Sequence, residues 1–183
     1  MSSPLVLQCH GDTPAPLVDG ISVAWQLFGD GQLWLRYFVD VAEENLVASG
    51  PAEPLRTDGL WNSTCFELFV RRPETTAYIE YNFAPSGQWA AYQFADYRRD
   101  VQNLPSPDSP EIGLDLGETH FALEATVRLP AEYHGLQIHV SLTAVIELRD
   151  GSKSYWSLRH PPGQPDFHHP DCFALTLEAP EQS

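Results

Sequence analysis

Three runs of alternating residues decide the fold class of this chain: CFELFV at residues 65–70, YIEYNF at residues 78–83 and WAAYQF at residues 89–94. A period of two is the period of a β-strand, whose successive side chains point to opposite faces of a sheet. The period therefore places Glu67, Glu80 and Asn82 on the face opposite the bulky apolar residues, which are Phe66, Leu68, Ile79, Tyr81 and Phe83.

Neighbouring strands of this kind would gather two carboxylates and an amide on one sheet face. Sugar hydroxyls both donate and accept hydrogen bonds, so a sugar site needs such groups beside an aromatic wall for the apolar face of the ring. The sequence therefore predicts a polar-ligand site on this face. An ordinary solvated sheet face has the same alternation, and the pattern by itself leaves both interpretations open.

The rest of the chain repeats short strand-like runs separated by turn residues. Residues 21–27 and 32–39 flank a Gly-Asp-Gly turn and form an expected hairpin. Further runs follow at residues 121–127, 136–147, 154–158 and 173–177. No segment has a helix-length period with caps at both ends. We predict an all-β fold, an antiparallel β-sandwich of the jelly-roll type.

Length and charge limit the domain organisation and the partners. The 183 residues fit one domain over residues 1–183, with an expected core over about 20–178 and mobile N- and C-terminal ends. Asp and Glu number 25 against 10 Lys and Arg, a formal net charge of -15, which excludes nucleic acid and anionic membranes as main partners. The N-terminus lacks signal-peptide features and no run is long enough to span a membrane, so we expect a cytoplasmic location.

A second group of polar residues lies in a proline-rich segment near the C-terminus and comprises His160, Asp166, His168 and His169. Imidazole and carboxylate ligands suit zinc or another divalent cation, so a small metal-dependent enzyme using residues 160–171 is one hypothesis. The spacing matches no known metal pattern. A loop that lines a ligand site and a purely structural loop remain alternatives.

Three tryptophans and one arginine complete the candidate site. Trp61 and Trp89 follow turns and can project over a ligand, whereas Trp156 fits either the site or the core. Arg98 is expected beside the acidic face, where it would orient one of the glutamates through a bidentate pair.

Several of these segments resemble a known family. DGLWNSTCFELF at residues 58–69 resembles the signature of DOMON-like domains, which are similar to the family 9 carbohydrate-binding modules. Residues 78–83 and 87–92 resemble the paired strands of the same fold. YWSLRHP at 155–161 and PDFHH at 165–169 resemble the C-terminal signature of bacterial stand-alone DOMON-like proteins. The resemblance covers roughly residues 23–177.

The resemblance implies an antiparallel β-sandwich that binds either a sugar or a haem. For a sugar, it implies that Trp61 and Trp156 are the stacking walls and that Glu67, Glu80 and Asn82 make the polar contacts. Haem iron needs axial ligands, and Met1 is the sole methionine. A haem-binding domain would therefore rely on two histidines, namely His160 or His168 together with His139 or His120.

Taken together, the sequence predicts a non-catalytic binding domain for a small polar ligand, a mono- or oligosaccharide. The expected site residues are Trp61, Glu67, Glu80, Asn82, Trp89, Arg98 and Trp156. We favour binding over catalysis and expect no required cofactor. The alternatives are a divalent-metal enzyme, a protein-interaction module and, less favoured, a haem-binding domain.

Overall fold

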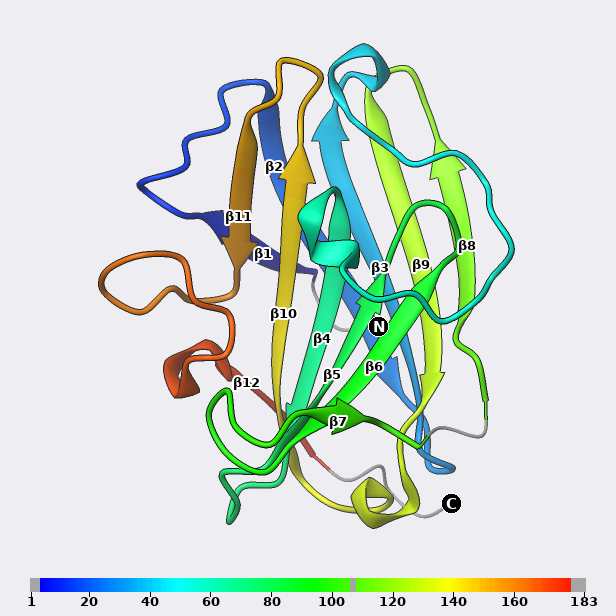
Figure 1. Ribbon diagram of the computed structural model, residues 1–183, viewed down its shortest axis with the longest axis vertical. Helices are drawn as coiled ribbons and strands as arrows, with labels where there is room; N and C mark the ends of the chain where they lie inside the picture. Colours follow the sequence, from blue (N-terminus) through cyan, green and yellow to red (C-terminus); the bar gives the residue numbers. More distant parts are fainter. Residues whose placement is uncertain (1–3, 106–107, 179–183) are drawn as a thin grey trace.

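The fold consists of two antiparallel sheets packed face to face (Figure 1). The computed structural model describes residues 4–105 and 108–178. Sheet A runs in the order β1 (Leu5–Cys9), β2 (Val18–Leu27), β3 (Gln32–Val41), β9 (His120–Arg128) and β8 (Glu111–Leu116). Sheet B continues from β1 through β11 (Lys153–Ser157), β10 (Ile138–Glu147), β4 (Cys65–Arg71), β5 (Tyr78–Phe83), β6 (Trp89–Phe94) and β7 (Gln102–Asn103). A short strand, β12 (Leu175–Leu177), pairs with β10.

Helical structure in the described residues is limited to four short 3-10 turns: η1 (Glu43–Asn45), η2 (Leu60–Asn62), η3 (Ala131–Tyr133) and η4 (Pro170–Cys172). The prediction of an all-β antiparallel sandwich is confirmed. Over the described parts of the chain, no helix has the length and apolar character needed to cross a membrane.

The core lies between the two sheets and is built from every second residue of each strand. Phe66 of β4 stacks on Phe121 of β9, with ring centroids 5.8 Å apart, so the rings join the two layers. The buried hydroxyl of Tyr37 in β3 donates to the backbone oxygen of Glu67 in β4 at 2.6 Å, which satisfies both groups away from water. Burying each such large side chain contributes about 1.5–3 kcal/mol.

Strand β1 joins the sheets and corrects the expected domain boundary. Its first part pairs with β2, where Leu7 lies opposite Ile21, and its last part pairs with β11, where Gln8 lies opposite Ser157. Leu7 is buried in the core. The prediction of a core that starts near residue 20, after a mobile end, is therefore wrong, because residues 5–9 form a strand of both sheets. The predicted mobile C-terminal tail falls on residues 179–183, which lie outside the described residues.

Candidate ligand-binding pocket

The outer face of sheet B carries the polar residues that the period of two predicts. Glu67 of β4 pairs with Asn82 of β5, and Phe69 pairs with Glu80, so the three polar side chains share the face directed away from the core. This face is not solvated. Glu67 is 3% exposed, Glu80 is 5% exposed and Asn82 is fully buried. The burial excludes the solvated-face interpretation.

Two segments, which we call the covering loops, contact this face: residues 95–101 between β6 and β7, and residues 158–174 between β11 and β12. Figure 1 shows both near β7 and β12. Phe167 and Phe173 of the second loop pack with Phe69 and Tyr78 of the sheet in a hydrophobic cluster separate from the main core. The loops therefore add a third layer over part of sheet B.

A pocket of about 460 Å³ remains between the sheet and the covering loops. This volume lies in the usual range for small-molecule sites. Its walls combine aromatic rings, two carboxyl groups and basic side chains, contributed by Trp61, Asn62, Glu67, Glu80, Tyr92, Phe94, Arg98, Val101, Val145, Lys153, Tyr155, Pro165, Phe167 and His168. Seven of the fourteen positions come from the strands of sheet B and the other seven from the loops and from η2.

Each of the two buried carboxyl groups receives one hydrogen bond from a side chain of the same sheet. The Thr143 hydroxyl donates to Glu67 Oε2 at 2.8 Å, and the Asn82 amide donates to Glu80 Oε1 at 2.8 Å. Among the described residues, no lysine or arginine forms an ion pair with either group. One oxygen of each carboxyl group is therefore held by a hydrogen bond, and both glutamates line the pocket.

Burial changes the protonation of these groups. Loss of solvation, together with the neighbouring Glu80 charge, raises the pKa of Glu67 to about 8. Burial raises the pKa of Glu80 to about 7, against the opposing effect of the Asn82 hydrogen bond. The pair therefore keeps a proton near neutral pH, so the pocket floor both donates and accepts hydrogen bonds.

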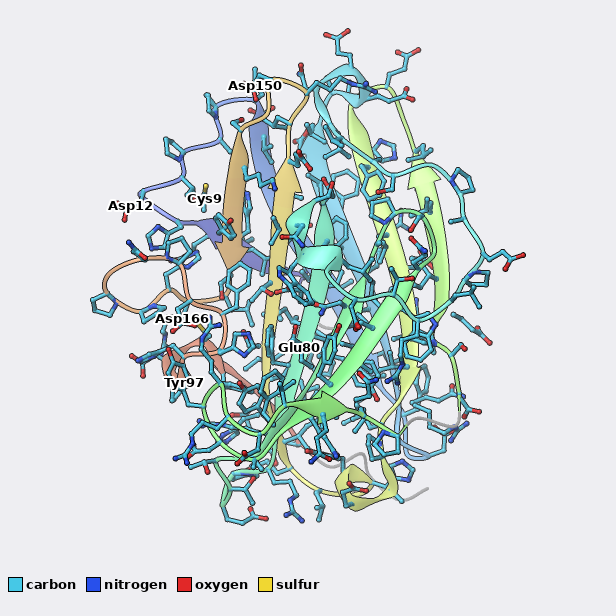
Figure 2. The ribbon with its side chains drawn as sticks, in the orientation of Figure 1. Cys9, Asp12, Glu80, Tyr97, Asp150 and Asp166 are labelled. Atoms are coloured by element: carbon cyan, nitrogen blue, oxygen red, sulfur yellow. The ribbon has the colours of Figure 1, made fainter. Side chains whose placement is uncertain are left out.

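Arg98 lines the pocket. The prediction that it orients a glutamate is wrong. Its Nη2 donates to Asp166 Oδ1 at 2.7 Å, which joins the two covering loops. Asp166 also accepts hydrogen bonds from the Tyr97 hydroxyl and from the His168 backbone N–H. Figure 2 shows Tyr97 and Asp166 side by side where the loops meet. Arg98 is directed to Asp166 because the carboxylate lies on the facing loop and is less buried than either glutamate.

His168 lies on the pocket wall, as the ligand-lining alternative predicted. Its Nδ1 is 2.7 Å from the Tyr78 hydroxyl, and its Nε2 is 3.8 Å from Glu80 Oε2. The rings of Phe69 and Phe94 each lie 5.2 Å away in edge-on geometry. Burial among these rings lowers the pKa of His168 to about 4, so the imidazole is neutral at pH 7.

The predicted metal ligands are not brought together. His160 Nε2 lies 2.8 Å from the Gln8 backbone oxygen, on the side of the fold where β1 and β11 meet. His169 Nδ1 accepts from the Asp171 backbone N–H at 3.2 Å. Within residues 4–105 and 108–178, no three His, Cys, Asp or Glu side chains are grouped to hold a metal ion. The side chains have different partners: Asp166 contacts Arg98 and Tyr97, and His168 contacts Tyr78.

The three candidate tryptophans have different positions. Trp61, on η2, is 44% exposed and lines the pocket beside Tyr92, with ring centroids 6.1 Å apart. Trp89 and Trp156 are each 6% exposed and belong to the core between the sheets, which corrects the prediction that they line the site. The cause is strand parity, because Trp89 pairs with Phe83 and Trp156 with the inward-facing Ala144.

The sequence interpretation missed several lining residues that the same parity indicates. Tyr92 and Phe94 lie two and four residues after Ala90, on the side of β6 opposite Trp89, and Tyr155 precedes the inward Trp156. Alternation within each strand could have found these three. Lys153 lies two residues before Tyr155 in β11 and has the same parity. Phe167 carries no such signal, because its position depends on a loop.

The fold is a β-sandwich, and one outer sheet face carries a pocket of about 460 Å³. No protein-family model matches the sequence, and no curated protein matches it. Among solved structures, the chain is similar to a "putative carbohydrate-binding protein" from Bacteroides uniformis ATCC 8492, with a TM-score of 0.65 and 18% identity over 93% of this chain and 82% of that one.

The chain is also similar to a family 9 carbohydrate-binding module from Caldicellulosiruptor kristjanssonii. The structure of that module with glucose gives a TM-score of 0.56 and 10% identity over 97% of this chain and 86% of that one. The structure of a family 9 module from the same organism with cellotriose gives a TM-score of 0.53 and 10% identity over 88% of this chain and 74% of that one. The chain therefore has the fold of family 9 carbohydrate-binding modules, as its resemblance predicts. The DOMON-like assignment stays a prediction.

Proposed function

We propose that this protein binds a mono- or oligosaccharide in the pocket on the outer face of sheet B, without converting it chemically. The observation that carries the proposal is the combination of an exposed aromatic side chain, Trp61, with two buried carboxyl groups, Glu67 and Glu80, around a cavity of about 460 Å³. Similar folds solved with glucose and with cellotriose support a sugar-like ligand.

The chemistry of the walls suits a sugar ring. Trp61 and Tyr92 offer aromatic surface, on which the apolar C–H face of a pyranose can pack. On the floor, Glu67 and Glu80 offer carboxyl oxygens to hydroxyl groups, and the proton that the pair keeps near neutral pH supplies a donor. The hydrogen bonds from Thr143 and Asn82 hold both carboxyls in place before a ligand arrives, which lowers the entropic cost of binding.

The proposal is tested with the purified full chain and a panel of glucose, cellotriose, other mono- and oligosaccharides, divalent cations and haem. A ligand that binds the folded state raises its stability by RT ln(1 + [L]/Kd), about 2.7 kcal/mol at a hundredfold excess over Kd. We expect at least one sugar to raise the Tm of the wild type, and calorimetry to give a one-to-one complex. Products of the incubated sugars, measured by chromatography, should stay absent.

Two variants locate the site. Trp61→Ala should weaken sugar binding by about tenfold or more while leaving the Tm without ligand nearly unchanged, because this side chain is largely exposed. Phe38→Ala, an exposed aromatic on the outer face of sheet A, is the matched control and should bind as the wild type does. A wild type that responds to no sugar, or to metals or haem alone, would contradict the proposal.

A further inference from the structure

A gap between two polar atoms in the pocket is shaped for one particular ligand group. His168 Nε2 and Glu80 Oε2 lie 3.8 Å apart, which is too long for a direct hydrogen bond. Both side chains line the pocket. An oxygen atom placed beside the two can lie at about 2.8 Å from each, the usual hydrogen-bond distance.

The neighbours of His168 favour one of its two neutral tautomers. The backbone N–H of Arg98 donates to the Tyr78 hydroxyl oxygen at 3.2 Å, and that hydroxyl lies 2.7 Å from His168 Nδ1. Because the oxygen already accepts from Arg98, its own hydrogen is free to point to Nδ1. Nδ1 is then the acceptor, and the neutral ring carries its hydrogen on Nε2, facing Glu80.

Glu80 offers the opposite chemistry on the other side of the gap. Its Oε1 accepts from Asn82, which fixes the plane of the carboxyl group and leaves Oε2 toward His168. In its ionised form, the carboxylate can only accept hydrogen bonds. The gap therefore has a donor, His168 Nε2–H, on one side and an acceptor, Glu80 Oε2, on the other.

We infer that His168 and Glu80 hold one ligand hydroxyl between them, which accepts from His168 Nε2 and donates to Glu80 Oε2. This inference rests on the proposed sugar binding. It makes His168 a specificity-determining residue and Tyr78, which acts through it, a positioning residue. A hydroxyl is the group that fits, since an ammonium has no lone pair for His168, and a carbonyl or ether oxygen has no hydrogen for Glu80.

The consequence is rejection of ligands that lack this one hydroxyl. A deoxy analogue would leave both the imidazole N–H and the carboxylate oxygen without a partner in a buried site, and such loss costs about tenfold to a hundredfold in affinity. A site built around a hydroxyl discriminates in this way far better than an apolar pocket does.

The first test measures calorimetric affinities for glucose and for the series of monodeoxy-glucoses, each lacking one hydroxyl. With the wild type, we expect one member of the series to bind about tenfold to a hundredfold more weakly than glucose. His168→Phe, which keeps a ring between Phe69 and Phe94, should lose a similar factor for glucose and should no longer distinguish that member from glucose. His168→Gln, which can return an N–H donor, should recover part of the loss.

The outcomes separate the two proposals. Failure of the wild type to bind any sugar overturns both. Sugar binding that His168→Phe leaves intact, or that it weakens equally for every deoxy analogue as well as for glucose, overturns the inference and leaves the proposed function standing. His120→Phe, on the outer face of sheet A, is the matched control and should bind as the wild type does.

The second test needs no ligand. Long-range ¹H–¹⁵N spectra distinguish the two neutral imidazole tautomers, and we expect the proton of His168 on Nε2. Tyr78→Phe removes the hydroxyl that fixes this state, so it should shift the tautomer signals and weaken glucose binding by several-fold. A proton on Nδ1 in the wild type, or Tyr78→Phe spectra identical to the wild type, would overturn the assignment.

Discussion

The outer faces of the two sheets carry the same kind of side chains in opposite environments. On sheet A, Arg36 lies between Asp115 and Glu124 at 2.7 and 3.0 Å, and the three side chains are 35%, 55% and 41% exposed. On sheet B, Glu67 and Glu80 are buried and have no such partner among the described residues. One face pairs its carboxylates in water, and the other holds its carboxyl groups in a pocket.

The difference comes from the loops and not from the strands. The strands of both sheets alternate polar and apolar residues, but the covering loops contact sheet B alone. Phe167 and Phe173 of the second covering loop pack on the outer face of sheet B. Exposed ion pairs contribute little to stability, about 0.2–1 kcal/mol, whereas burying a carboxyl group without a cation costs several kcal/mol. The covered face of sheet B carries this cost, and the solvated face of sheet A does not.

The largest expected effect is the dependence of stability on pH. The pKa values of Glu67 and Glu80 rise from 4.5 to about 8 and about 7 on folding, so these groups favour the folded state at low pH. Their contribution is complete below pH 4.5 and is lost as the pH rises through 7 and 8. The double variant Glu67→Gln/Glu80→Gln lacks both ionisable groups, so its stability should fall by several kcal/mol less than that of the wild type between pH 4.5 and pH 9.

This prediction is checked by urea unfolding from pH 4.5 to pH 9. His168 lies 3.8 Å from Glu80, so the difference between variant and wild type reports the two glutamates together with their effect on His168. Glu124→Gln, from the exposed face of sheet A, is the control and should follow the wild-type pH curve. Parallel curves for the double variant and the wild type would mean that the pocket floor is solvated like sheet A.

The next effect concerns the contact that holds the covering loops together. Asp166→Asn weakens the hydrogen bonds from Arg98, Tyr97 and the His168 backbone, and should cost about 1–2 kcal/mol of stability. It should also raise protease cleavage within residues 95–101 and 158–174 relative to the strands. Asp171→Asn, more exposed on the same loop, is the matched control. Equal cleavage in both variants would show that the loops are held by their aromatic side chains alone.

The smallest effect is expected on the solvated face. Arg36→Gln removes two exposed ion pairs on sheet A and should lower stability by less than about 1 kcal/mol, decreasing further in high salt. Sugar binding should be unchanged. Thermal unfolding at low and high salt measures the stability of the variant. A loss of stability as large as that of Asp166→Asn would contradict the contrast between the two faces.

Strand parity explains how much the sequence could predict. The period of two correctly placed Glu67, Glu80 and Asn82 on one face, and the same rule applied to Trp89 and Trp156 would have assigned both to the core. Parity does not tell whether a face is covered, because coverage comes from loops whose contacts join distant residues.

The residues of the 160–171 segment show this limit. His168 meets Tyr78 and His160 meets Gln8, partners that no local spacing indicates. Strand β1 was missed because five residues near a chain end carry too little pattern to distinguish a strand from a tail. The cytoplasmic location, the exclusion of nucleic acid and the lack of a required cofactor remain predictions.

Strand β1 also has a consequence for how the chain folds. It is synthesised before the other strands, yet Gln8 pairs with Ser157 of β11, which is made after nearly all of them. Strand β1 can therefore join sheet B to sheet A only late in synthesis, when most of the chain is present. Pairing across so long a separation slows folding. Until β11 is made, β10 and the unpaired end of β1 are open strand edges, which are prone to aggregation.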